Sequence, residues 1–150
     1  MKRFCRVEQE DYARILDADW DLATVRAAAA KAVSNSRRVQ WLDDGSEHPH
    51  RIALNTHHEE IESVTASIRA AVTAAGHKAQ FVVSGIGEYR YLDILSVHGG
   101  KMNAVEYVRR IYDVKQDRCL TAGDSGNDIL MLEGAIHILP VSQLSIVCLV

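Results

Sequence analysis

Two carboxylates, Asp124 and Asp128, lie in a short segment that also contains Gly123 and Gly126. An apolar strand pattern precedes this segment and a helical pattern follows it, so the expected arrangement is strand, glycine turn and helix. In such an arrangement both carboxylates can face the crevice in which open α/β sheets bind ligands. Mg²⁺ prefers one or two carboxylates together with waters and substrate phosphate oxygens. These residues therefore predict a Mg²⁺ site at Asp124 and Asp128.

A simpler interpretation of the same residues is a helix N-cap, because Asp, Ser and Asn cap helices well and acidic side chains suit a first turn. The complete string Gly-Asp-Ser-Gly-Asn-Asp at residues 123–128 is much more specific than a cap. It resembles the fourth motif of the haloacid dehalogenase-like phosphatases, in particular of their sucrose-phosphatase branch. The resemblance implies a Mg²⁺-dependent enzyme in which Asp124 and Asp128 hold the metal.

A second match to this branch lies at residues 91–108, where Lys101 opens a helix just after an extended segment. The position resembles that of the lysine in the branch's third motif. This implies a catalytic role for Lys101, which would neutralise charge on the transferring phosphoryl group. We expect a βαβ crossover to bring Lys101 close to Asp124, although the two residues are far apart in the sequence.

Asp17 and Asp19 imitate the Asp-x-Asp pair with which this phosphatase family forms its phosphoenzyme. We predict that the match is accidental, because Asp21 stands where the family has Thr or Val and because the preceding apolar residues have a helical period. The segment that begins at Trp20 instead resembles the start of the sucrose-phosphatase cap. Since the first and second motifs of the family precede the cap, the chain is expected to be a truncated phosphatase that is inactive alone.

The elements that position these residues follow from the apolar periodicity and from the turn residues. Two helices in series are predicted within residues 11–33, the second of them capped by Asp21, and a third helix at residues 59–75. Strands are predicted at residues 38–42, 51–55, 78–84 and 90–95 and at Cys119. The helix after Lys101 is predicted to bury Ala104, Val105, Val108, Ile111 and Tyr112. This order of elements predicts an α/β fold.

The resemblance further implies a partial Rossmannoid core of the haloacid dehalogenase type together with an α/β cap domain. The cap would comprise residues 11–95, and residues 96–150 would form the C-terminal part of the core. A small sugar phosphate is the expected partner. Candidates for binding it are the cap residues Arg51, Asn55, Ser84 and Gly85, although each of them alone also fits an ordinary strand or turn role. The sequence leaves the identity of the sugar and the oligomeric state open.

The composition excludes several other classes of protein. The chain has 150 residues, 47% of them hydrophobic, and a formal net charge of −3, so it lacks the basic surface that nucleic acid or an anionic membrane requires. No apolar run approaches the roughly 20 residues that span a bilayer. Three cysteines without close pairing favour a reducing, cytoplasmic compartment. The closest histidines, His48, His50, His57 and His58, do not predict a zinc site, because no third ligand has suitable spacing.

Two functions of different classes fit the sequence. The first is a Mg²⁺-dependent phosphatase that hydrolyses the phosphate monoester of a disaccharide. The second is a non-catalytic domain that keeps the cap's sugar-phosphate-binding surface for binding or regulation. An Asp-x-Asp-x-Thr segment encoded in frame before Met1 would favour the enzyme.

Overall fold

The computed structural model describes residues 10–123, 128, 131 and 137–140. Their helices and strands are α1 (Glu10–Asp17), α2 (Leu22–Ala32), β1 (Gln40–Asp43), β2 (Arg51–His57), α3 (Ile61–Ala74), β3 (Ala79–Ser84), β4 (Tyr89–Ser96), α4 (Gly100–Ile111), the 3₁₀ helix η1 (Gln116–Arg118), β5 (Leu120–Gly123) and β6 (His137–Pro140). The helices and strands expected between residues 11 and 95 are therefore confirmed, with ends shifted by a few residues. Among the described residues, no helix is long and apolar enough to cross a bilayer.

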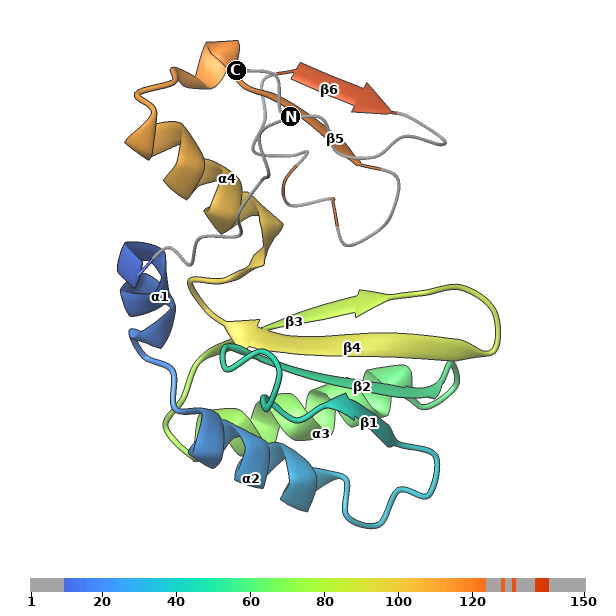
Figure 1. Ribbon diagram of the computed structural model, residues 1–150. Helices are drawn as coiled ribbons and strands as arrows, with labels where there is room; N and C mark the ends of the chain where they lie inside the picture. The colour runs from blue at the N-terminus through green and yellow to red at the C-terminus, as the bar shows by residue number, and fades with distance from the viewer. Residues whose placement is uncertain (1–9, 124–127, 129–130, 132–136, 141–150) are drawn as a thin grey trace, which may run out of the picture.

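Strands β1 to β4 form an antiparallel sheet in the order β1-β2-β4-β3. Helices α2 and α3 cover one face of this sheet, while α4 and the β5–β6 pair lie beyond its other side (Figure 1). The core between the helices and the sheet is aliphatic and consists of Val25, Ala29, Val33, Ile52, Leu54, Ile61, Val64, Ile68, Val72, Leu92 and Ile94. Because side chains alternate along a strand, the intervening residues of β2 and β4 point to the opposite, open face.

The ends of α2 and α3 follow from local residue chemistry. The carboxylate of Asp21 accepts a hydrogen bond from the backbone N–H of Thr24 at 2.7 Å, which confirms the predicted cap. Helix α3 stops before Gly76, which has a φ of +83° that glycine adopts without strain. The next N–H group, that of His77, donates to the carbonyl of Val72 and closes the last turn.

Asp43, the last residue of β1, is a buried carboxylate that holds the turn into β2. It accepts a hydrogen bond from the backbone N–H of Gly45 at 2.8 Å, and its other oxygen lies 2.7 Å from Nδ1 of His48. Burial raises the pKa of Asp43, but these hydrogen bonds lower it and outweigh the burial, so the pKa lies below its usual value. His48 therefore has a structural partner in this turn.

The region around α4 differs from the predictions. The predicted burial of Val108, Ile111 and Tyr112 was wrong, because these side chains are 43%, 51% and 66% exposed. A helical period shows that one face is apolar, but it does not show that another element covers that face. The predicted βαβ crossover was also wrong: β4 is already flanked by β2 and β3, and β5 pairs in parallel with β6 in a separate sheet. Cys119 lies just before β5 and is half-buried.

Candidate functional site

Lys101 is the second residue of α4, and the turn before it sets its direction. Gly100 has a φ of +87°, and a Cβ there would come within 3.0 Å of Oε1 of Gln80. Nε2 of Gln80 donates to the carbonyl of Gly99 at 3.1 Å, and Nδ2 of Asn103 donates to the same carbonyl at 2.7 Å. Gln80 on β3 and Asn103 on α4 thus tie the sheet to the start of the lysine-bearing helix. Neither amide was among the site residues predicted from the sequence.

The structure brings Lys101 together with Asp128. Nζ of Lys101 lies 2.5 Å from Oδ1 of Asp128, and the Asp128 side chain is only 2% exposed. A buried carboxylate requires a charged or hydrogen-bonding partner, which the ammonium group provides. Gly123 at the end of β5 lets the Asp128 side chain lie against the backbone of β5, because a Cβ at position 123 would overlap that side chain. Asp124, the other predicted metal ligand, lies outside the described residues.

The Lys101–Asp128 pair has the chemistry of a phosphate and metal site. A carboxylate is a hard oxygen donor of the kind that Mg²⁺ takes, and it offers up to about four lone-pair positions. The ammonium group, 39% exposed as a side chain, can act as a point charge toward a phosphate oxygen. The residues present therefore fit Mg²⁺, while the roles of Lys101 and Asp128 in catalysis stay predictions.

Three of the four predicted sugar-binding residues gather on the open face of the sheet. The strand register places Asn55 opposite Tyr91, and Tyr91 opposite Ser84, so these side chains form one row across β2, β4 and β3. Gly85 follows the row with a φ of +90°, and a Cβ there would lie 2.8 Å from Cδ2 of the Tyr91 ring. Tyr91 is 46% exposed. Tyr91 was not among the site residues predicted from the sequence. Its position on the polar face of an alternating strand is the signal that could have indicated it.

Arg51, the fourth predicted sugar-binding residue, lies apart from this row. It starts β2 and pairs in register with Leu95 near the end of β4. Its Nε donates to Oδ1 of Asp93 at 2.9 Å, on the same open face. The ion pair uses one of the five guanidinium N–H donors. Arg51 therefore lies at the end of the sheet from which the chain continues into α4.

Comparison of the sequence with known protein families identifies the family of the chain. The model of the sucrose-6F-phosphate phosphohydrolase family matches residues 4–146, which is nearly the whole chain. The chain belongs to this family. The resemblance stated from the third-motif and fourth-motif residues is thus confirmed. No curated protein sequence gives a significant match.

Solved structures of low sequence identity share the fold. Sucrose-phosphatase from Synechocystis sp. PCC6803, in complex with sucrose and phosphate, has a TM-score of 0.73 and 20% identity, and the match covers 91% of this chain and 53% of that one. IMP-bound, N-terminally truncated IMP-nucleotidase from Plasmodium falciparum has a TM-score of 0.59 and 16% identity, with coverages of 91% and 39%. The haloacid dehalogenase-like hydrolase yhjK from Bacillus subtilis has a TM-score of 0.51 and 14% identity, with coverages of 87% and 49%.

These similarities confirm the α/β fold of haloacid dehalogenase type. They also show that the chain spans about half the length of the sucrose-phosphatase that it resembles.

Asp17 is the last residue of α1, and Asp19 lies in the turn between α1 and α2. Oδ1 of Asp17 lies 2.7 Å from Nε2 of His50, and Oδ2 of Asp19 lies 3.7 Å from Nε2 of His98. Asp17 ends a helix, which confirms the helical period that was predicted before it. The two aspartates thus link this segment to the start of β2 and to the loop after β4. That the pair is not a nucleophile stays a prediction.

Proposed function

We propose that this chain is the cap and the C-terminal core segment of a Mg²⁺-dependent phosphatase that hydrolyses the phosphate monoester of a disaccharide. In this proposal residues 11–95 form the cap and residues 96–150 belong to the core. The ion pair between Lys101 and the buried Asp128 carries the proposal, because it joins the third-motif lysine to the fourth-motif acidic turn. The family match supports it. A cytoplasmic location agrees with the three cysteines.

Charge stabilisation is the contribution that we assign to Lys101 and Asp128. The ammonium group of Lys101 neutralises charge on the phosphoryl group, next to the N-terminus of α4, where the helix dipole also favours anions. Asp128 keeps the ammonium group in place and would hold Mg²⁺ together with Asp124. When bound, Mg²⁺ polarises the phosphoryl oxygens as a Lewis acid. Both cations act on the charge of the transition state.

The covalent step needs a carboxylate nucleophile in line with the leaving oxygen. Asp17 and Asp19 contact His50 and His98, and Asp17 is the last residue of a helix instead of following a strand. We therefore expect the nucleophile to come from a segment that this chain does not contain. On this proposal the chain alone hydrolyses no sugar phosphate at a useful rate.

The sugar is proposed to bind on the open face of the sheet. The exposed ring of Tyr91 can pack against the apolar C–H face of a sugar, while Asn55 and Ser84 on either side can hydrogen-bond its hydroxyl groups. Gly85 leaves room beside the ring, and Arg51 has further N–H donors for a hydroxyl or phosphate group. The complex of the Synechocystis sucrose-phosphatase with sucrose and phosphate supports this class of ligand.

Binding without catalysis is the second candidate function. It is favoured by the contacts of Asp17 and Asp19 with His50 and His98, since no Asp-x-Asp pair outside residues 17–21 occurs among the residues that the structure describes. A regulatory domain of this kind would still bind a sugar phosphate through the open face. It would differ from the enzyme in one respect, because no added segment would give it turnover.

A phosphate-release assay with sucrose 6-phosphate and Mg²⁺ tests the proposal. It is run on this chain and on the chain extended by a family-like N-terminal segment with an Asp-x-Asp motif. Turnover by the extended chain but not by the short chain would support the phosphatase function. In the extended chain, Lys101→Met should abolish turnover, whereas Lys115→Met, at an exposed control position, should retain it. Binding without turnover in the extended chain would favour the regulatory domain. Turnover by the short chain that Asp17→Asn or Asp19→Asn removes would show that this pair is the nucleophile.

A further inference from the structure

A group of metal-ligating side chains lies at the end of β2, where the strand turns into α3. His57 is the last residue of the strand, and His58 and Glu59 follow it. One ligand atom from each of the three residues lies within 4.8 Å of the others. Strand geometry puts this end of β2 about 20 Å from Arg51 at its other end, since the strand rises about 3.3 Å per residue. The group is therefore remote from the end of the sheet that leads to Lys101.

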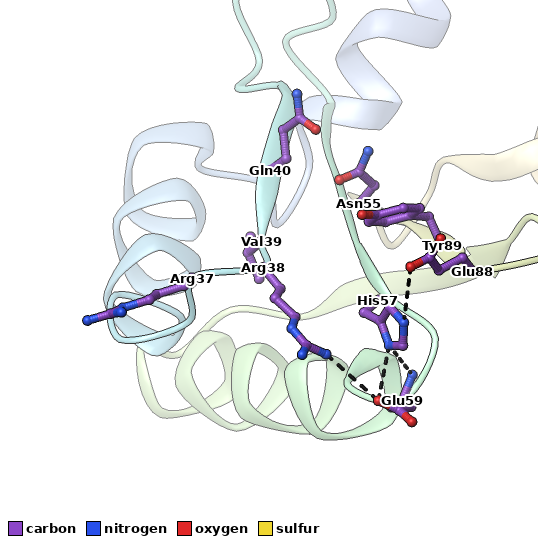
Figure 2. A pocket seen from close by; sticks show the side chains of 9 residues that line it. All are labelled: Arg37, Arg38, Val39, Gln40, Asn55, His57, Glu59, Glu88 and Tyr89. Atoms are coloured by element: carbon purple, nitrogen blue, oxygen red, sulfur yellow. Dashed lines mark hydrogen bonds and ion pairs between the residues drawn. The ribbon is translucent and has the colours of Figure 1, made fainter.

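The separation of two of the ligand atoms suits a small dication. Nδ1 of His57 lies 3.3 Å from Oε2 of Glu59 (Figure 2). Zinc binds imidazole nitrogen and carboxylate oxygen at about 2.0–2.2 Å, so two ligands at a tetrahedral angle are about 3.4 Å apart. The exposed His58 ring lies beside the His57 ring, with centroids 4.5 Å apart, so it can offer a third ligand.

The surroundings of His57 favour the tautomer that a metal requires. Nδ1 accepts a long hydrogen bond of 3.4 Å from the backbone N–H of Glu59, which favours the tautomer with the proton on Nε2, and a bound cation would take the Nδ1 lone pair in place of this hydrogen bond. The carboxylate of Glu88 lies 3.7 Å from Nε2, on the opposite side of the ring. A carboxylate behind the second nitrogen orients a ligating histidine and makes it more basic. The His57 side chain is only 16% exposed, and the Tyr89 ring lies nearly perpendicular to it with the centroids 6.2 Å apart, which further limits its motion.

The negative charge of the group and its access to solvent also fit a bound cation. Glu59 and Glu88 face His57 from two sides. The guanidinium group of Arg38 reaches Glu59 and Glu60 at the long distances of 3.7 and 3.6 Å, and Arg37 lines the same cavity. His57, Glu59 and Glu88 line a surface cavity of about 510 Å³ (Figure 2). An ion held by three protein ligands would keep its fourth position open to this cavity.

We propose that His57, His58 and Glu59 bind a transition-metal dication of the Zn²⁺ class, and that Glu88 orients His57. Imidazole nitrogens select such an ion over Mg²⁺, which prefers an all-oxygen shell. The site is thereby chemically distinct from the acidic turn at Asp128. It does not depend on the phosphatase proposal, because it shares none of the residues placed in that reaction.

Calorimetric titration of the chain with Zn²⁺ tests the site, with variants of its two exposed ligands. His58→Gln and Glu59→Gln should each weaken Zn²⁺ binding by more than about tenfold, since even the outer partners of metal ligands are worth about 10–100-fold. The matched controls are His77→Gln and Glu62→Gln, which change the same residue types at positions outside the group. Both controls should bind Zn²⁺ as the parent chain does, and circular dichroism verifies that all four variants fold.

Glu88→Gln provides the readout of orientation. This variant retains all three ligands, so it should still bind Zn²⁺ but with an affinity reduced by about tenfold. Excess Mg²⁺ should not displace Zn²⁺ from the parent chain. The proposal is overturned if the parent binds no Zn²⁺, if His58→Gln and Glu59→Gln bind it as tightly as the controls do, or if Mg²⁺ competes for the same site.

Discussion

Lys101→Met removes the ammonium partner of Asp128 while keeping an unbranched side chain of similar length. Asp128 is 2% exposed, so water has little access to replace the lost charge partner. Removing one partner of a fully buried ion pair costs about 3–5 kcal/mol. The Lys101 side chain is 39% exposed, and solvent therefore already weakens the pair. We expect the free energy of unfolding to fall by about 2 kcal/mol, which is below the fully buried range.

Urea denaturation followed by circular dichroism measures this loss, and a double-mutant cycle with Asp128→Asn assigns it to the pair. The free energy of unfolding that Lys101→Met removes should be smaller by about 1 kcal/mol in the Asp128→Asn background than in the parent chain. The reason is that the substituted amide side chain carries no charge for the ammonium group to balance. The exposed control Lys115→Met should change the free energy of unfolding by no more than about 0.5 kcal/mol. An equal cost of Lys101→Met in both backgrounds, or a cost no larger than that of Lys115→Met, would refute the reasoning.

Burial opposes ionisation of Asp43, but its hydrogen bonds outweigh the burial and hold the pKa of this carboxyl group below its usual value. The ionised carboxylate therefore stabilises the fold fully above the unfolded-state pKa of about 3.9. This stabilisation is lost as the pH falls through the lower folded-state pKa. The loss of stability in Asp43→Asn, measured by urea titration, should therefore shrink below about pH 4, and a pH-independent loss would contradict this. Tyr91→Ala should weaken the binding of sucrose 6-phosphate, measured by calorimetry, by about tenfold, since an aromatic contact is worth about 0.5–1.5 kcal/mol beyond its buried area. The control Tyr112→Ala, at an exposed position on α4, should leave this binding unchanged. Equal effects of the two substitutions would remove Tyr91 from the sugar site. Gly100→Ala should lower the free energy of unfolding by about 1–2 kcal/mol, because both its positive φ and its close contact oppose a methyl group. Gly87→Ala, with a similar φ but open space, should cost less, and an equal cost in thermal or urea unfolding would show that the contact at Gly100 is unimportant.

Local features of the sequence were sufficient to predict most of the elements. The cap at Asp21 depends on one side chain and the N–H groups of the next turn, and the alternation in β2 and β4 depends only on which residues are apolar. The same holds for the hexapeptide at residues 123–128, whose residue types are specific enough to indicate the family. Each of these signals is contained in a few neighbouring residues, so no knowledge of long-range pairing is needed to read it.

Tertiary structure alone decided which of these residues meet. The pairing of Lys101 with Asp128, the row of Asn55, Tyr91 and Ser84, and the approach of Glu88 to His57 all depend on strand register and on the path of the chain between sheets. Periodicity specifies the face of an element but not its neighbour. The exposed apolar face of α4 illustrates the same limit, because an amphipathic pattern is identical whether or not another layer covers it.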